Sequence, residues 1–317
     1  MTKSLREIEA SLKLADVVLY VLDARAPYSC INPAFDALVE FKPVIYVLNK
    51  ADLAPEASVT VWKERLLGKI TNYKLQITNS DGQGDGPIGQ GGQGGQGDGP
   101  IDHDKNEKRK RMAVALDGTA SGSAKKILPL IKELARAKIE KCAKKGVNAS
   151  LRGMVIGVPN SGKSTLINNF CGSAKTITGN KPGVTRGKQW VRVNEYFELL
   201  DTPGTLYPKL SDQTVARKLA YIGSVKDEVV DTFALACAFI EDMQKIAPEA
   251  LQTRYGITQS SPPPCVIPLK IMSSIAASRG FLLRGGEADV ERAASAVLDD
   301  FRKGRLGKIC LDNPVDN

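Results

Sequence analysis

The sequence predicts an α/β fold: a doubly wound, mostly parallel sheet followed by a small all-α domain. Residues 17–22 and 44–48 are short apolar runs rich in β-branched side chains, which is typical of strands buried on both faces of a parallel sheet. Residues 154–156 form a third apolar run, and it leads through a loop into a helical pattern. From about residue 212 onward, apolar residues recur at helical spacing. We therefore expect two domains, at residues 1–215 and 216–317.

The composition indicates a globular protein with an excess of positive charge. The 317 residues include 44 lysines and arginines against 35 aspartates and glutamates, a formal charge of +9. This balance suits a phosphate-rich partner such as RNA, although ordinary surface lysines would also explain it. The six cysteines show no C-x-x-C spacing, which indicates neither a zinc site nor a redox motif. The longest apolar runs are too short to span a membrane. We expect a cytoplasmic monomer, with a mitochondrial location as the alternative, although no transit peptide is visible.

The first part of the chain is predicted to alternate between helices and strands. Residues 3–14 have the apolar spacing of an amphipathic helix, and the strand at 17–22 follows. The run Asp23-Ala24-Arg25-Ala26-Pro27 is then a predicted loop, and residues 33–40 are a predicted helix. The strand at 44–48 ends in the tetrapeptide Asn49-Lys50-Ala51-Asp52, which fits the pattern N-K-x-D.

This tetrapeptide has the chemistry of a guanine-binding motif. The Asp52 carboxylate can accept two hydrogen bonds from the N1–H and amino groups of guanine, whereas adenine presents the wrong pattern there. Asn49 can meet the opposite base edge and brace the loop, and the Lys50 stem can lie over the base plane. Alone, the tetrapeptide could also be a turn in which Asp52 caps a helix. Together with residues 157–165, which fit the phosphate-binding pattern G-x-x-x-x-G-K-[ST], it favours GTP and GDP as ligands, bound in part by Asn49, Lys50, Ala51 and Asp52.

The chain then contains a low-complexity insert at about residues 79–110. Residues 82–101 are almost all Gly, Gln, Asp and Pro, and one seven-residue sequence occurs twice, at 82–88 and 95–101. Such a segment has no apolar pattern to pack, so we expect disorder. The basic run at 108–111 is better explained as a solvated flank of this insert than as an RNA-touching loop. Residues 62–67 before the insert are predicted as helix.

After the insert, residues 112–116 are a predicted strand, 117–122 a loop and 123–144 one long helix with lysine and arginine on its outer side. The loop at 117–122 lies where a second guanine-contacting element would be expected. Its sequence matches the usual pattern for such an element poorly, so no single residue is assigned there.

Residues 157–165, Gly-Val-Pro-Asn-Ser-Gly-Lys-Ser-Thr, fit the phosphate-binding loop G-x-x-x-x-G-K-[ST]. Its glycines let backbone N–H groups surround a phosphate, and the helix that follows adds partial positive charge. Lys163 would reach the terminal phosphates, and the Ser164 hydroxyl would bind Mg²⁺. A chance Gly-rich turn is the alternative, which the flanking strand and helix make improbable. The predicted nucleotide-binding residues here are Asn160, Ser161, Gly162, Lys163, Ser164 and Thr165.

Two further segments resemble the switches of nucleotide-dependent proteins. In the loop at 181–187, Thr185 could close over Mg²⁺ and the terminal phosphate. Strands are predicted at 189–193 and 196–200, and the second ends in Asp201-Thr202-Pro203-Gly204, which fits D-x-x-G. Asp201 would hold a water molecule on Mg²⁺, and the Gly204 N–H would sense the terminal phosphate. Ordering of such loops by the γ-phosphate and Mg²⁺ is how these proteins switch.

The last third of the chain carries no catalytic constellation. Helices are predicted at 212–221, 228–245, 268–279 and 287–303, with an extended connector at 260–264 and a basic tail at 302–308. We interpret this region as an interaction domain.

The order of the motifs is unusual, because N-K-x-D precedes the phosphate loop, the Thr switch and D-x-x-G. All of them follow predicted strands, and ligands of open α/β sheets bind at the C-terminal ends of strands. Circular permutation preserves such a site while moving the chain ends. The sequence therefore predicts a circularly permuted P-loop GTPase domain whose D-x-x-G segment leads directly into the helical domain.

With these motifs the chain resembles the circularly permuted GTPases of the YlqF/RbgA (ribosome biogenesis GTPase A) family, nearly from end to end except for the insert. The resemblance rests on the motifs above, on residues 23–27 with Asn32-Pro33, on residues 182–186 and on the closing segment 302–307. It implies GTP hydrolysis, binding to the large ribosomal subunit precursor, and a helical domain that touches ribosomal RNA. It also implies stimulation by K⁺ through the loop asparagine, here Asn160.

The residue that activates water is not identified, so the catalytic residue stays unknown. No glutamine follows D-x-x-G, where Thr205 stands instead of the large apolar residue usual in the family. The family's N-terminal histidine would fall just before Met1, and the chain's one histidine, His103, lies in the insert. We expect slow hydrolysis, because of either a start site assigned too late, which we favour, or a group supplied by the ribosome.

Two other function classes compete with a ribosome-assembly GTPase. One is a GTP-dependent RNA- or protein-binding switch with negligible hydrolysis, which binding to ribosomal subunits would distinguish. The other is an ATP-using metabolic kinase, which keeps the phosphate loop but leaves Asn49-Lys50-Ala51-Asp52 unexplained.

Overall fold

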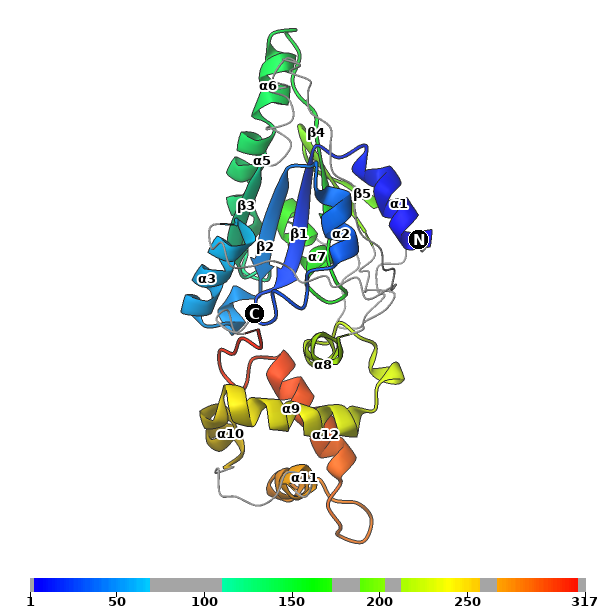
Figure 1. Cartoon of the computed structure of the whole chain (residues 1–317), viewed down its shortest axis with the longest axis vertical. Coiled ribbons are helices and arrows are strands. Elements are labelled where there is room, and N and C mark those ends of the chain that lie inside the picture. Colours follow the sequence, from blue (N-terminus) through cyan, green and yellow to red (C-terminus); the bar gives the residue numbers. More distant parts are fainter. Residues whose placement is uncertain (1–2, 69–109, 173–188, 203–211, 257–266, 313–317) are drawn as a thin grey trace, which may run out of the picture.

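The computed structural model describes residues 3–68, 110–172, 189–202, 212–256 and 267–312. A sheet-containing part and a helical part lie one above the other in Figure 1, with helix α8 where they meet. The predicted insert, the predicted switch residues Thr185 and Gly204, and the connector at 260–264 lie outside the described residues. In the described part of the chain, no helix combines the length and apolar character that crossing a membrane requires.

Six strands form one sheet in the order β3-β2-β1-β4-β6-β5. Their bounds are β1 (Val17–Asp23), β2 (Val44–Asn49), β3 (Arg111–Leu116), β4 (Leu151–Ile156), β5 (Gln189–Asn194) and β6 (Phe197–Asp201). All neighbours pair in parallel except β5 with β6. The register aligns Asp23 with Asn49 and Val155 with Asp201, so the ends of the central strands lie along one edge. The prediction of a mostly parallel sheet is confirmed.

Helices cover both faces of this sheet, because alternate side chains of its central strands point to opposite sides. Val18, Tyr20 and Leu22 pack in one buried cluster beneath α1 (Lys3–Leu12), α2 (Pro33–Val39) and α3 (Glu56–Leu66). Val17, Leu19 and Val21 pack in a second cluster beneath α7 (Lys163–Cys171) and the segment that follows β3. This burial explains the continuous apolar runs that predicted the strands, and it makes the fold doubly wound.

The prediction of one long helix over 123–144 is wrong. The segment divides into a 3₁₀ turn η2 (Ser123–Ile127), a short helix α5 (Leu128–Leu134) and a second helix α6 (Arg136–Ala143). Pro129 stands in the first turn of α5, where its missing N–H costs nothing, but its ring prevents an α-helix from continuing through the residues before it. The second break falls at Ala135, whose φ and ψ of −93° and 11° leave the α-helical region.

The helical part contains α8 (Gln213–Tyr221), a 3₁₀ turn η3 (Asp227–Val229), α9 (Thr232–Ile246), α10 (Pro248–Tyr255), α11 (Ile267–Ser278) and α12 (Val290–Arg302). Two predicted helices begin later than expected, at the caps Asp231 and Asp289, whose side chains accept backbone N–H groups. Helix α10 was not predicted, although Pro248 at its start and Gly256 after its end are typical helix boundaries. The boundary proposed at residue 215/216 falls within α8.

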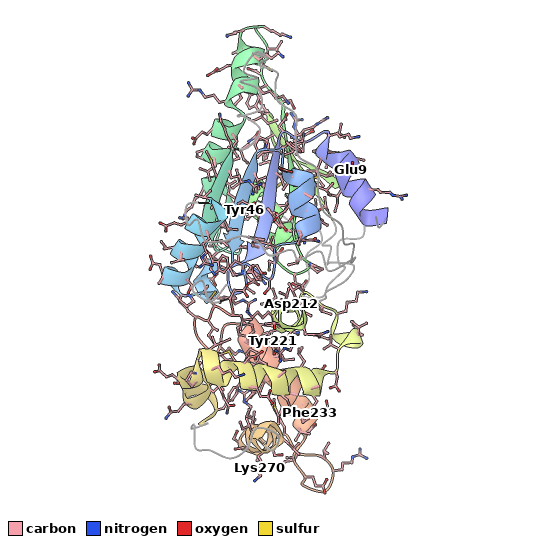
Figure 2. All side chains as sticks on the ribbon, viewed as in Figure 1. Glu9, Tyr46, Asp212, Tyr221, Phe233 and Lys270 are labelled. Carbon is pink, nitrogen blue, oxygen red and sulfur yellow. The ribbon has the colours of Figure 1, made fainter. Side chains whose placement is uncertain are left out.

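The helical part and the sheet part share one continuous buried cluster. Tyr221 lies between α8 and α9, as Figure 2 shows, and its ring meets Phe239 edge-on at 5.1 Å. The chain then returns to the sheet part after α12. The Leu311 N–H donates to the Arg25 carbonyl, and the Asp312 carboxylate accepts from the backbone N–H and hydroxyl of Ser29. The two parts are therefore packed together through apolar side chains and fastened by hydrogen bonds.

Asp300 of α12 organises the charged interior of the helical part. Its fully buried carboxylate accepts hydrogen bonds from Arg254, Arg279 and Arg305, at 2.6–3.2 Å, and from the Tyr255 hydroxyl. Burial alone would raise the pKa of Asp300, but the hydrogen bonds from the arginines outweigh it and lower the pKa to about 2. Helices α10 and α12 and the residues that follow α11 and α12 are thus held together by one anion.

Replacing Asp300 with Asn should lower the free energy of unfolding by about 3 kcal/mol at pH 7, because three guanidinium groups lose their common anion. A carboxyl group whose pKa is lower in the folded state stabilises the fold above its unfolded pKa of about 4 and loses that effect as pH falls toward 2. The difference between the wild type and the variant, measured by urea denaturation, should therefore shrink from pH 5 to pH 2.

Asp299→Asn is the matched control, because Asp299 is 46% exposed and pairs only with Lys303 among the described residues. An exposed pair contributes less than about 1 kcal/mol. Equal destabilisation by the two substitutions would contradict the role assigned to Asp300.

Candidate nucleotide-binding site

The predicted motifs meet at the edge of the sheet where β1, β2, β4 and β6 end. Asn49 at the end of β2 donates from Nδ2 to the Ser161 carbonyl at 2.8 Å, across 112 residues of sequence. Its Oδ1 accepts from the Gly118 N–H at 2.8 Å. One side chain thus ties the tetrapeptide Asn49-Lys50-Ala51-Asp52 to the phosphate loop and to the loop after β3.

The phosphate loop has the backbone conformation that its glycines permit. Gly157, with φ of 148°, lies so close to the Val21 carbonyl that a Cβ atom would collide with it. Gly162, with φ of 91°, lies equally close to the Asn49 side chain. Any side chain at these two positions would displace the loop from its strand or from Asn49. The geometry therefore explains two of the glycines in the sequence pattern.

Lys163 begins helix α7, and its side chain lies buried inside the loop. Nζ donates to the Val158 carbonyl at 2.8 Å. Burial lowers the pKa of Lys163 to about 8, although the charge of Asp201 acts in the opposite direction. No side chain caps the start of α7 among the described residues, so the first backbone N–H groups of this helix are available to an anion.

Asp201 lies at the end of β6 beside Ser164. The Ser164 hydroxyl donates to Asp201 Oδ2 at 2.9 Å. Burial raises the pKa of Asp201, while the hydrogen bond from Ser164 and the charge of Lys163 oppose this shift. The other carboxylate oxygen, Oδ1, is buried and has no hydrogen-bond partner among the described residues. Such an atom indicates a place where water or a hydrated ion is expected.

Lys50 gives the tetrapeptide Asn49-Lys50-Ala51-Asp52 a second contact with the phosphate loop. Lys50 adopts a left-handed conformation, with φ of 58°, and its Nζ donates to the Asn160 carbonyl at 2.8 Å. The Asp52 side chain remains accessible to solvent. Partial burial and the charge of Asp117 raise the pKa of the Asp52 carboxyl. The carboxylate is thus positioned at the open side of the site, where a base could reach it.

The loop after β3 contributes residues that the sequence did not single out. Gly118 approaches Asn49 so closely that a Cβ atom would lie 2.6 Å from Oδ1. Asn169 of α7 donates to the carbonyls of Gly118 and Ala120 and accepts from the Ala124 N–H. These contacts hold the loop against both motifs. A lone glycine and a helical asparagine give no local signal of such a role.

A chain of charged side chains runs from the tetrapeptide Asn49-Lys50-Ala51-Asp52 to the helical part. Lys50 pairs with Asp23 at 2.9 Å, and Asp23 binds the Arg25 guanidinium through both oxygens at 2.8 and 2.9 Å. Arg25 in turn donates to the carbonyls of Phe301 and Arg302, at the end of α12. Burial opposes ionisation of Asp23, but Arg25 and Lys50 hold its pKa well below the usual range. Arg25 thereby caps a helix C-terminus of the other part.

A second link joins the phosphate loop to the turn after α8. Asn160 donates from Nδ2 to the Gly223 carbonyl at 2.7 Å, and the Ser224 hydroxyl donates to the Pro159 carbonyl at 2.7 Å. The phosphate loop therefore contacts the helical part directly, whereas the tetrapeptide Asn49-Lys50-Ala51-Asp52 is linked to it through Asp23 and Arg25.

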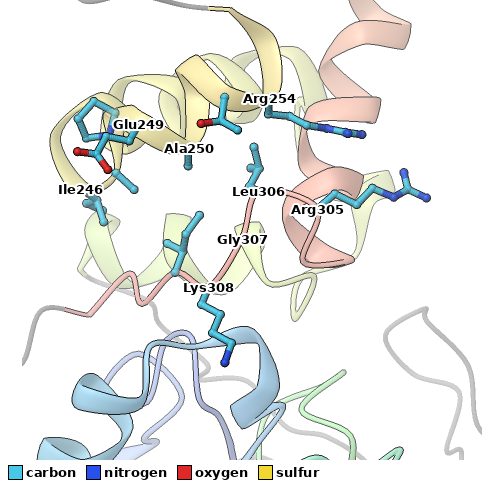
Figure 3. A pocket seen from close by; sticks show the side chains of 12 residues that line it. Ile246, Glu249, Ala250, Arg254, Arg305, Leu306, Gly307 and Lys308 are labelled. Carbon is cyan, nitrogen blue, oxygen red and sulfur yellow. The ribbon is translucent and has the colours of Figure 1, made fainter.

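A pocket of about 720 Å³ lies elsewhere, between α9, α10 and the segment 305–309. Figure 3 shows Arg254 and Arg305 beside it, and both side chains bind Asp300. None of the predicted nucleotide-binding residues lines this pocket. We therefore do not assign it to the nucleotide.

Comparison with known proteins identifies related GTPases. Residues 152–263 match the family model of the 50S ribosome-binding GTPase. The chain is 33% identical over 317 residues to ribosome biogenesis GTPase A of Bacillus cereus, a match that covers 100% of this chain and 92% of that protein. It is 27% identical to ribosome biogenesis GTPase A of Thermotoga maritima, and this match covers 99% of the chain and 92% of the relative.

Among solved structures, the crystal structure of GNP-bound YlqF from Thermotoga maritima resembles this chain. The TM-score is 0.58 at 24% sequence identity, and the match covers 100% of both chains. At this identity the likeness concerns the fold alone. The fold agrees with the prediction of a circularly permuted GTPase domain with a helical C-terminal part.

Proposed function

Because this chain belongs to the ribosome biogenesis GTPase A family, we propose that it binds the precursor of the large ribosomal subunit and leaves it according to the bound nucleotide. The protein is a GTP-binding assembly factor of ribosomal subunit biogenesis, and it hydrolyses GTP to GDP and phosphate. The family resemblance inferred from the motifs is thereby confirmed. The precursor particle, its ribosomal RNA, the cytoplasmic location and the monomeric state are parts of the proposal.

The structural observation that supports a guanine nucleotide as the ligand is the hydrogen bond from Asn49 to the phosphate loop. It ties N-K-A-D to a phosphate loop that lies 112 residues later in the sequence. A phosphate loop alone would suit an ATP-using kinase equally well. With the tetrapeptide fixed beside it, one nucleotide can contact Asp52 through its base and Lys163 through its phosphates.

The residues around the phosphate loop also fit Mg²⁺. Ser164 offers a hydroxyl, and Asp201 offers the buried Oδ1 that has no partner among the described residues. Asp201 would act through a water molecule, and Thr185 would be the further ligand. When bound, Mg²⁺ neutralises charge on the phosphates. K⁺ at Asn160 is a further part of the proposal. A cation binds a carboxamide oxygen, so the hydrogen bond from Asn160 Nδ2 to Gly223 is compatible with it.

Two observations support control of the helical part by the nucleotide. The phosphate loop contacts the turn after α8 through Asn160 and Ser224, and D-x-x-G precedes α8 in the chain. We propose that loss of the γ-phosphate changes these contacts and thereby the affinity for the particle. We also propose a low intrinsic rate of hydrolysis, because D-T-P-G is followed by Thr205 where other GTPases place a glutamine.

The proposal predicts that the wild type co-sediments with large ribosomal subunits or their precursors more strongly with a non-hydrolysable GTP analogue than with GDP. Binding should weaken as salt rises, since phosphate contacts release counterions. Lys163→Ala is the control, and its co-sedimentation should not respond to nucleotide. Failure of the wild type to co-sediment at low salt in every nucleotide state would favour a GTP-dependent switch for another RNA or protein.

A further inference from the structure

Helices α5 and α6, with the turn that precedes them and residues 144–147, form a projecting arm. We call residues 125–147 the basic arm. Figure 1 shows α6 at the end of the molecule opposite the helical part. Ile131, Leu134 and Ala135 anchor the arm in the buried cluster beneath the sheet. Helix α6 has no buried residue of its own, and Lys138 holds it in place through Asp16 and the Ser150 carbonyl.

The basic arm is densely and asymmetrically charged. It carries eight lysines and arginines but only the acidic residues Glu133 and Glu140. Arg136 pairs with Glu140, and Lys138 pairs with Asp16. The other basic side chains are all exposed and make neither ion pairs nor hydrogen bonds with the described residues. These are Lys125, Lys126, Lys132, Lys141, Lys144 and Lys145.

The fold gives only a small reason for this charge. Lys141 in the last turn of α6 interacts favourably with the helix dipole, but it also lies three residues from Lys138, a spacing at which like charges destabilise a helix. Lys144 and Lys145 follow the helix and form no ion pair with the described residues. The helical part differs in this respect. Its helices α9 and α12 carry more acidic than basic residues. Its arginines at 254, 279 and 305 all bind Asp300. The helical part also has basic side chains that are unpaired among the described residues, including Lys226, Lys245, Lys270, Arg284 and Lys308, but they are spread over its length, whereas the arm gathers six within 23 residues.

We propose that the basic arm binds the phosphate backbone of RNA, at the end of the GTPase domain remote from the helical part. Flexible, unpaired lysines suit phosphates, which attract them without regard to sequence. Residues 125–147 contain no aromatic side chain on which a base could stack and only one arginine. The arm therefore holds RNA by its backbone and does not read its bases. The choice of RNA among polyanions rests on the proposed function in ribosome assembly.

The test compares three variants of the full chain. The first variant reverses the sign of charge at three positions of the basic arm, by Lys141→Glu, Lys144→Glu and Lys145→Glu together. The second variant is the matched control, and it changes the net charge of the chain by the same amount. It carries Arg6→Glu on α1, Lys13→Glu just after α1 and Lys63→Glu on α3, all on the other face of the sheet. Lys141→Arg, Lys144→Arg and Lys145→Arg keep the charge. GTP affinity should be unchanged in all three, which shows that the fold is intact.

The first probe is an arbitrary RNA hairpin of about 20 base pairs, titrated at several salt concentrations. Reversal of the arm should weaken binding about tenfold or more. It should also reduce the slope of log affinity against log salt by about 2.7 if all three lysines contact phosphates, since each lost phosphate contact contributes about 0.9. The matched control should change affinity less than about threefold, and the arginine variant should bind like the wild type.

Three outcomes would overturn the inference. The first is no wild-type binding to the hairpin at low salt, and the second is equal weakening of binding by the arm and control variants. The third is stronger binding of the protein to polyglutamate or phosphatidylglycerol vesicles than to the hairpin at the same salt.

The second probe, co-sedimentation with large subunits, separates this inference from the proposed function. If charge reversal on the arm changes neither hairpin affinity nor co-sedimentation, the arm is excluded as an RNA-binding site while the proposed function stands. If charge reversal weakens hairpin binding but the wild type does not co-sediment with large subunits, the proposed function fails while RNA binding by the arm stands.

Discussion

Replacing Lys163 with alanine is expected to lower the affinity for GTP about 100-fold or more, which corresponds to roughly 2.7 kcal/mol. In the structure Nζ lies buried within the phosphate loop and donates to the Val158 carbonyl. A bound nucleotide would exchange that neutral partner for charged phosphate oxygens, where a charge-assisted hydrogen bond is considerably stronger. Isothermal titration calorimetry with Mg²⁺ and GTP measures the loss directly.

Without nucleotide, the variant should have a melting temperature equal to or above that of the wild type. The reason is that the wild-type fold must bury the Lys163 ammonium group away from water, and the variant avoids this cost. The increase in melting temperature that GTP causes in the wild type should disappear. Lys63→Ala, in the last turn of α3, is the control and should retain both GTP affinity and the thermal shift. Near-normal GTP turnover by Lys163→Ala would exclude this loop as the phosphate site.

Replacing Asp52 with asparagine should weaken GTP about 100-fold and make xanthosine triphosphate the better ligand. The Asp52 carboxylate would accept hydrogen bonds from the N1–H and amino groups of guanine, and a site built to accept those hydrogens rejects a base that lacks them. The asparagine amide can instead donate to the carbonyl that xanthine has in place of the amino group. Competition of GTP and of xanthosine triphosphate against a fluorescent GTP analogue measures the affinity for each, and hence the change in preference between them.

Glu56→Gln is the matched control for this change of charge, since Glu56 lies four residues further on in the first turn of α3. It should bind GTP normally and gain no affinity for xanthosine triphosphate. If the wild type binds ATP as tightly as GTP, the tetrapeptide does not select guanine and the assignment fails.

The strands and motifs could be predicted because their signals are local. Continuous apolar runs mark strands buried on both faces, and the phosphate loop and N-K-A-D each occupy a few consecutive residues. The break of the predicted helix at 123–144 had a local sign in Pro129, which the charge pattern on both sides obscured. The helix α10 was missed although Pro248 and Gly256 mark its ends, because so short a segment has weak periodicity.

Other features had no local sign at all. Gly118 is required because Asn49 lies against it, 69 residues away in sequence. The contact of Arg25 with α12 joins residues 276 positions apart, and nothing in the loop that contains Arg25 indicates which partner will cover it. Such pairings follow from the packed fold, so a single sequence read by local pattern cannot supply them.

The separation in sequence between Arg25 and Phe301 also affects the order in which the protein can fold during synthesis. During synthesis the chain emerges from its N-terminus, so β1, β2 and N-K-A-D appear before the phosphate loop that must lie beside them. At about 20 residues per second, roughly 14 s pass between the appearance of Arg25 and that of Phe301. Throughout that interval the Arg25–Asp23 pair lacks the helix end that covers it. The nascent chain therefore cannot join N-K-A-D to the phosphate loop before Ser161 has been made, and the buried pair beside that tetrapeptide stays uncovered until α12 has been synthesised.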